Sequence, residues 1–215
     1  MRLVLIRHGE TEHNRGQLTL GRADVPLNER GRAQARSLAA SFLRAPDAIV
    51  SSPLARALDT ARSIARATGA TIAIDDGLIE MDVGAMEHLT SAELRAGHAD
   101  FLQQWMSRDC GDARMPGGET LREVQDRAWA SIERLHGEHP EGEVIVVSHN
   151  FVILMVICRA LALPIADFRH IRQALAARTV IDVGERGCTL VQLNDQSHLL
   201  AAGVGGDLLH REARA

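Results

Sequence analysis

Near the start of the chain, Leu3-Val4-Leu5-Ile6-Arg7-His8-Gly9-Glu10-Thr11 is an aliphatic run that ends abruptly in arginine, histidine and glycine. Such a run is typical of a buried parallel strand. In open α/β sheets, ligands bind at the carboxyl ends of the strands, where Arg7 and His8 would stand. Arginine offers a planar cation for phosphate or carboxylate, and histidine a nitrogen that attacks or carries a proton near neutral pH. The stretch therefore predicts a strand that delivers reactive side chains to a binding edge.

Two further apolar runs end in the same kind of side chain. Residues 48–50 lead into Ser-Ser-Pro-Leu-Ala and then Arg56, in the first turn of a predicted helix, and residues 144–147 lead into Ser-His-Asn with His149. Because the carboxyl ends of parallel strands share one edge, we expect one cavity to receive Arg7, His8, Arg56 and His149. Gathering these groups is costly without an anion, and arginine binds phosphate through bidentate, charge-assisted contacts. The pattern predicts a phosphoryl-binding site.

A phosphoryl acceptor and a proton donor are then needed. No cysteine sits in an anion-binding loop and no aspartate follows a strand in a magnesium pattern, so His8 is the best nucleophile. Its attacking nitrogen must be unprotonated, which a backbone carbonyl bonded to the other ring nitrogen would arrange. Glu80 and Glu87 both follow the third strand and are candidate acids, because burial near a phosphate raises the pKa of a carboxyl.

Six strand-like runs at 3–6, 48–51, 71–74, 144–148, 179–183 and 189–193 alternate early with helical patterns. The alternation indicates βαβ units and a largely parallel sheet. Helices are predicted from a cap at Asn28, over 54–67, around 90–106 and over 119–135. We expect one domain over 1–202, a lid-like insertion around 77–116, and a tail at 203–215 that frays.

Composition narrows the class of function. The chain has 215 residues, a net charge of −4 and only 3% aromatic residues, which argues against nucleic acid as a partner. All 24 basic residues are arginine, so no lysine Schiff base or P-loop lysine is available. Cys110, Cys158 and Cys188 fit neither a zinc spacing nor a disulfide framework. The sequence shows no signal peptide, and the apolar residues 144–165 are interrupted as expected of a strand, a turn and a helix rather than a membrane span. We therefore expect a cytoplasmic protein with no membrane partner.

Taken in order, the motifs resemble the histidine phosphatase superfamily, the phosphoglycerate-mutase-like proteins of branch 1, over Leu3 to about Leu193. The resemblance lies in residues 5–11 with Asn14, 21–27 with Gly31 and 34–35, 52–57 with 60–61, 116–120 and 147–149. Departures from the family pattern occur at Leu20, Met86, His88 and Asn150, which we expect to form an altered rim around an intact phosphate pocket.

The resemblance implies a three-layer α/β/α sandwich with a mostly parallel six-stranded central sheet. It implies that His8 accepts the phosphoryl group, that Glu80 is the proton donor, and that no metal or organic cofactor is needed. The phosphate and substrate site it implies consists of Arg7, Asn14, Gly21, Arg56, His149 and Asn150.

The predicted function is a phosphatase that hydrolyses a small phosphorylated metabolite through a phosphohistidine. A mutase that returns the phosphoryl group to its substrate is the alternative, disfavoured because this chain lacks the lysines and tyrosines that such enzymes carry. A non-catalytic phospholigand-binding protein is a third reading. Arg15, Arg22 and His88 either contact the substrate or are solvated surface residues, and a homodimer is left open.

Overall fold

The computed structural model describes residues 1–204. Its six strands form one sheet in the order β3-β2-β4-β1-β5-β6. Neighbours among the first four strands in that order run parallel, whereas β5 is antiparallel to β1 and β6 to β5. The strands are β1 (Arg2–Arg7), β2 (Ala48–Ser51), β3 (Ile72–Ile74), β4 (Glu143–Ser148), β5 (Arg178–Gly184) and β6 (Gly187–Asp195). The predicted mostly parallel six-stranded sheet is confirmed.

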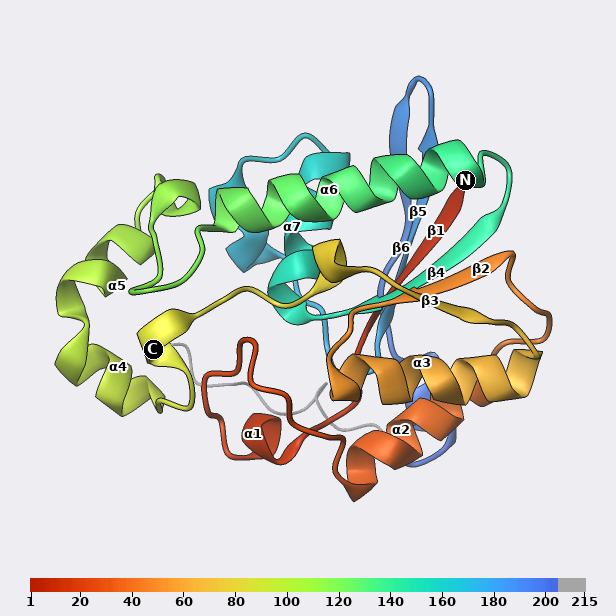
Figure 1. The fold of residues 1–215 in the computed structure, drawn as a ribbon, viewed down its shortest axis with the longest axis horizontal. Helices are drawn as coiled ribbons and strands as arrows, with labels where there is room; N and C mark the ends of the chain where they lie inside the picture. Colours follow the sequence, from red (N-terminus) through yellow and green to blue (C-terminus); the bar gives the residue numbers. More distant parts are fainter. Residues whose placement is uncertain (205–215) are drawn as a thin grey trace.

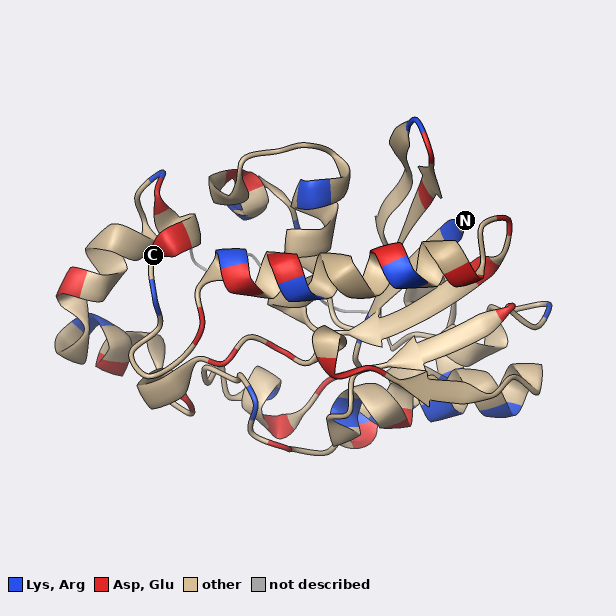
Figure 2. Cartoon of the chain, turned by 45° about the horizontal axis from the view of Figure 1, so that its top comes forward, with Lys and Arg blue, Asp and Glu red and all other residues tan. Residues whose placement is uncertain are grey.

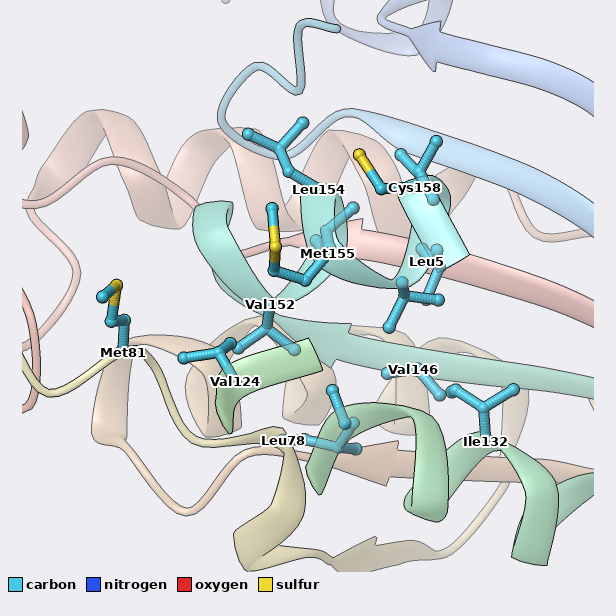
Figure 3. Close-up of a cluster of buried hydrophobic side chains, with 14 of the residues drawn as sticks. Leu5, Leu78, Met81, Val124, Ile132, Val146, Val152, Leu154, Met155 and Cys158 are labelled. Carbon is cyan, nitrogen blue, oxygen red and sulfur yellow. The ribbon is translucent and has the colours of Figure 1, made fainter. Parts of the chain in front are cut away.

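Helices cover both faces of the sheet (Figure 1). Helices α2 (Glu29–Ala40) and α3 (Ala55–Thr68) lie on one face, and α6 (Leu121–Glu138) and α7 (Asn150–Ala160) on the other. Alternate strand residues supply two separate cores, since successive side chains point to opposite faces. Leu5 and Val146 pack with α6 and α7 (Figure 3), while Ile6 and Val147 pack with the α2 and α3 side. Burial on both faces explains the unbroken aliphatic runs, and the three-layer prediction is confirmed.

The predicted helix boundaries agree closely where a cap fixes them. The Asn28 side chain accepts a hydrogen bond from the Gly31 N–H and begins α2. Helix α3 ends at Gly69, which has a positive φ of 76°. Helix α6 begins after Thr120, whose hydroxyl accepts from the Glu123 N–H, and it runs three residues beyond the predicted end.

The prediction of a single helix around 90–106 is wrong. The segment forms α4 (Ser91–Gly97) and α5 (Ala99–Trp105), with His98 at φ −136° between them. The break turns α5 so that Trp105 packs edge-on against Phe151 and Phe168, at ring-centroid distances of 5.8 and 5.9 Å. Burial of these rings outweighs helix continuity at a weak helix former, Gly97.

Shorter elements complete the described chain. They are α1 (Glu12–Arg15), α8 (Ser197–Ala201) and the 3₁₀ turns η1 (Asp76–Leu78), η2 (Gly84–Met86), η3 (Cys110–Asp112) and η4 (Ile165–His170). No helix among residues 1–204 is both long and apolar enough to cross a membrane. Of the tail predicted to fray, 205–215 lie outside the described residues.

The carboxyl ends of β2, β4 and β1 lie side by side, as predicted. Arg7 pairs with Ser148, and Ser51 with Val147. Beyond the strands the register continues, because the His8 N–H donates to the Ser148 carbonyl and the Ser52 N–H to the Val147 carbonyl, both at 3.0 Å. Charged residues gather along the helices and loops, and most of each strand is uncharged (Figure 2). In β1, β2 and β4, polar groups therefore gather where the strands end.

Candidate active site

His8 lies at the end of β1, 3% exposed. Its Nδ1 lies 2.7 Å from the Gly9 carbonyl oxygen. A carbonyl can only accept, so Nδ1 carries the hydrogen and Nε2 is left with a lone pair. Burial, and then the charges of Arg56 and Arg7, hold the pKa of His8 well below its ordinary 6.5. The geometry is that of a neutral imidazole whose Nδ1 is bonded to a backbone carbonyl, the arrangement that the predicted role requires.

The position directly after His8 has no room for a side chain and is occupied by Gly9. A Cβ on Gly9 would lie 2.6 Å from the Gly31 carbonyl oxygen, closer than real contacts allow. The Gly9 N–H donates to the Thr60 hydroxyl at 3.1 Å, and that hydroxyl donates to the Arg56 carbonyl at 2.8 Å. Thr60 thus connects the loop that follows His8 to helix α3.

Arg56 is fully buried in the first turn of α3. Its guanidinium donates to the carbonyls of Gly21 and Ala23, at 2.6 and 2.7 Å. Burial lowers its pKa, while the charges of Glu80 and Glu87 act in the opposite direction. Its Nε has no hydrogen-bond partner among the described residues.

His149 is fully buried at the end of β4, with its ring centroid 5.2 Å from that of His8. Its Nε2 lies 2.7 Å from the Ser52 hydroxyl, which connects it to the end of β2. Burial, followed by the charge of Arg56, holds the pKa of His149 well below 6.5. Its Nδ1, like the Nε of Arg56, finds no partner in residues 1–204. A buried polar atom without a partner costs about 1–3 kcal/mol, so a ligand that bonds to both atoms would remove this cost.

The remaining predicted pocket residues differ in what they contact. One Arg7 nitrogen donates to the Gln173 carbonyl at 2.7 Å, and the Arg7 charge acts on both histidines. Asn14 accepts from the backbone and hydroxyl of Thr11 and so caps α1. Asn150 is the first residue of α7 and is half-buried.

Gly21 contributes its backbone to the site. Its carbonyl accepts from Arg56, and a Cβ there would lie 2.7 Å from both the Met81 carbonyl oxygen and a Val83 methyl. Its N–H donates to Glu87 Oε1 at 2.7 Å.

Glu80 and Glu87 have different surroundings, and only Glu80 suits an acid. Glu80 is 3% exposed, and burial raises the pKa of its carboxyl against the opposing effect of the Met81 N–H and of Arg56. Glu87 Oε1 and Oε2 accept from the N–H groups of Gly21 and Ala23, which uses that carboxylate to hold the loop. The structure therefore favours Glu80 between the two candidates.

Two residues of the region were not singled out from the sequence. Arg127 and Glu119 surround the backbone of Glu80 through an ion pair with N–O distances of 3.0 Å. Arg22, half-exposed, reaches the same cluster, donating to the Glu80 carbonyl and pairing with Glu119 at 3.1 Å. Pro116-Gly117-Gly118-Glu119 was recognised as a motif, but no local pattern links it to 77–80.

The rim predicted to carry the family departures is partly misplaced. Met86 is 2% exposed and belongs to the core cluster that also contains residues of α6 and α7, since its side chain is apolar and η2 turns it inward. His88 is exposed, has φ +68°, and its Nδ1 lies 3.0 Å from His13 Nε2 on α1. Leu20 is half-buried.

The buried neutral histidines predict a pH dependence of stability. An unfolded chain protonates His8 near 6.5, whereas the folded chain does so only at lower pH, so the free energy of unfolding falls as pH drops below 6.5. In His8→Asn that slope should shrink by up to about 1.4 kcal/mol per pH unit. Urea unfolding at several pH values between about 7 and 5 measures it. An unchanged slope would contradict the assignment of a neutral buried imidazole.

Comparison with known proteins places this geometry in a family. A sequence model of the histidine phosphatase superfamily (branch 1) matches residues 3–196. Phosphoserine phosphatase 1 of Hydrogenobacter thermophilus is 31% identical over 200 residues, covering 93% of this chain and 94% of that protein.

Solved structures agree. The α-ribazole phosphatase from Shigella flexneri has a TM-score of 0.80 and 31% identity, covering 91% of this chain and 96% of that one. A mycobacterial glucosyl-3-phosphoglycerate phosphatase in complex with VO3 has a TM-score of 0.81 and 31% identity, covering 91% and 99%.

Some relatives are longer. The chain spans 55% of the length of three mycobacterial proteins to which it is 33% identical over 201 residues. The family match extends from the first strand through the last, and it includes every strand end that carries a site residue. The chain belongs to the histidine phosphatase superfamily, branch 1.

Proposed function

We propose that this protein hydrolyses small phosphate monoesters through a phosphohistidine formed on His8, without a metal ion. One observation carries the proposal. His8 offers an unprotonated Nε2 in a buried site where Arg56 Nε and His149 Nδ1 lack partners within the described residues. A phosphoryl group would satisfy both and would bring its phosphorus to the nucleophile.

In the first step, the His8 Nε2 lone pair forms a P–N bond as the P–O bond to the leaving group breaks. Glu80 gives its proton to the departing oxygen, so an alcohol leaves and a carboxylate remains. Arg7, Arg56 and His149 stabilise the charge on the three transferred oxygens. A Ser52 hydroxyl that donates to Nε2 of His149 would leave the ring hydrogen on Nδ1, where it could bind a phosphoryl oxygen.

In the second step, water attacks the phosphorus on His8 and passes a proton to the Glu80 carboxylate. The P–N bond breaks, inorganic phosphate leaves, and both side chains return to their first state. Low basicity of His8 helps here, because a histidine with a lowered pKa is a better leaving group.

The relatives support the substrate class. They are named as phosphatases of phosphoserine, α-ribazole and glucosyl-3-phosphoglycerate, which points to phosphorylated metabolites rather than macromolecules. A structure of a phosphoserine phosphatase from Entamoeba histolytica holds 3-phosphoglyceric acid. We therefore propose a small phosphorylated metabolite as substrate.

A panel of phosphorylated metabolites, assayed with EDTA present, tests the proposal. We expect phosphate release that EDTA leaves unchanged, because arginines and imidazoles would supply the phosphate contacts. Conversion of 3-phosphoglycerate to its isomer without phosphate release would instead support the mutase. Tight binding without turnover across the panel would support a phospholigand-binding protein, and loss of activity in EDTA would contradict the metal-free mechanism.

A further inference from the structure

We propose that Arg127 and Glu119 are positioning residues for Glu80, which they hold at the leaving-group oxygen, and that this adapts the site to phosphate esters of aliphatic alcohols. The proposal rests on the proposed phosphatase function. It concerns residues that would touch neither the phosphate nor the leaving group but fix the segment that presents the acid.

Arg127, on helix α6, uses its whole guanidinium on the segment around Glu80. Its NH1 donates to the carbonyls of Gly77 and Ile79, at 2.8 and 2.6 Å, and its NH2 to the carbonyl of Glu80 at 3.2 Å. Its Nε and NH2 also donate to the two carboxylate oxygens of Glu119, both at 3.0 Å. The five donors of a guanidinium thus have five acceptors. A lysine has three donors and could not replace them.

Glu119 secures the other side of the same segment. Its Oε2 accepts from the Asp82 N–H at 2.9 Å, and its own N–H donates to the Asp82 carbonyl at 2.9 Å. Gly118 permits this approach, because a Cβ there would lie 2.2 Å from the Asp82 carbonyl oxygen. Arg127 therefore holds the backbone of residues 77–80, and Glu119 holds residue 82. The backbone of Glu80 is fixed on both sides.

The Glu80 side chain itself has few anchors. Oε1 accepts from the neighbouring Met81 N–H at 2.9 Å, and Oε2 lies 3.5 Å from the Phe151 N–H, at the limit of a hydrogen bond. Its direction is consequently set by the backbone that carries it. A displacement of about 1 Å in a reacting group can cost about 10²-fold in rate, so a fixed backbone has catalytic value.

The Arg127–Glu119 ion pair also bears on the protonation of Glu80. Arg127 is one of the cations that oppose the raised pKa of Glu80, though its effect is smaller than those of Arg56 and Arg7. Glu119, which also pairs with Arg22, offsets part of the positive charge at this position. The guanidinium can therefore orient the segment without driving Glu80 to ionise.

A held, protonated carboxyl matters most for a poor leaving group. An aliphatic alkoxide is strongly basic and needs a proton as the P–O bond breaks, whereas p-nitrophenolate departs readily without one. Loss of the Arg127–Glu119 ion pair should therefore slow the hydrolysis of alkyl esters more than that of aryl esters. This difference separates a positioning role from a structural one, which would lower both rates alike.

The test compares kcat/KM for p-nitrophenyl phosphate and for the best alkyl phosphate of the panel. Arg127→Met should lower the alkyl value about 10²-fold and the aryl value less than about 5-fold. The alkyl-ester kcat/KM of Arg127→Lys should lie between those of Arg127→Met and the wild type. Glu119→Gln should also lose more on the alkyl ester than on the aryl ester, but by a smaller factor. In a Glu80→Gln background, Arg127→Lys should cause no further loss on the alkyl ester.

Arg134→Met is the matched control, because Arg134 lies on the same helix and is half-exposed in ion pairs with Asp75 and Glu138. It should leave both values unchanged. Equal losses on the two esters, or a full further loss in the Glu80→Gln background, would overturn the positioning role. Glu119→Gln and Arg127→Lys keep the test open if Arg127→Met fails to fold. A wild type with no His8-dependent hydrolysis would instead contradict the proposed function itself.

Discussion

His8→Ala should lose at least about 10⁴-fold in kcat on any ester that the wild type hydrolyses, because removing a nucleophile leaves only binding and charge stabilisation. The site is built around that nitrogen. Its Nδ1 is occupied by the Gly9 carbonyl, and its pKa is held low by burial and by Arg56. Alanine removes the atom that we propose forms the covalent intermediate.

Rapid quench with ³²P-labelled substrate gives a second measurement. The wild type should carry label that is lost in acid and kept in alkali, as expected of a phosphoramidate, and His8→Ala should carry none. His170→Ala is the control, since His170 is an exposed residue of η4, and it should keep both rate and label. Undiminished turnover in His8→Ala would remove His8 as the nucleophile.

Glu80→Gln should lower kcat for alkyl phosphates by about 10²–10³-fold, the range that a general acid contributes. It should lower the rate for p-nitrophenyl phosphate far less. The pH dependence of kcat gives a second test of the role of Glu80. The acid must be protonated, so wild-type kcat should fall as pH rises through the pKa of Glu80, which burial raises above its ordinary 4.5. Glutamine does not titrate, so this decline should be absent from the variant.

Glu87→Gln distinguishes the two carboxylates that follow the third strand. Glu87 holds the N–H groups of Gly21 and Ala23, whose carbonyls in turn bind Arg56. Its loss should weaken phosphate binding and raise KM for alkyl and aryl esters by the same factor. A selective loss on alkyl esters in Glu87→Gln, with none in Glu80→Gln, would reverse the assignment of the acid.

Strand ends were the part of the site that local sequence could predict. Aliphatic runs of three or four residues followed by polar groups identified β1, β2 and β4, because strands buried on both faces need apolar residues at every position. Parallel neighbours then place their carboxyl ends together, which brought Arg7, His8, Arg56 and His149 to one edge without any knowledge of side-chain contacts.

Other features depended on contacts between distant residues. The residue pattern alone left Glu80 and Glu87 open and the family resemblance favoured Glu80, whereas only the structure shows that Glu87 accepts from the N–H groups of Gly21 and Ala23. The break at His98 depended on aromatic packing between α5 and α7. Met86 was misplaced because its burial depends on packing with distant residues of the same core cluster. None of these is a periodic property of the local chain.

The sequence by itself determined the strands and the capped helices, since hydrophobic period and capping residues act within a few positions of one another, and it predicted His8 as the nucleophile. The tertiary structure alone decided how the acid is held. Arg127 meets the carbonyls of Gly77 and Ile79 some 50 residues away. Only packing of α6 beside η1 closes that gap, because a guanidinium's hydrogen bonds form at about 3 Å and leave no periodic trace along the chain.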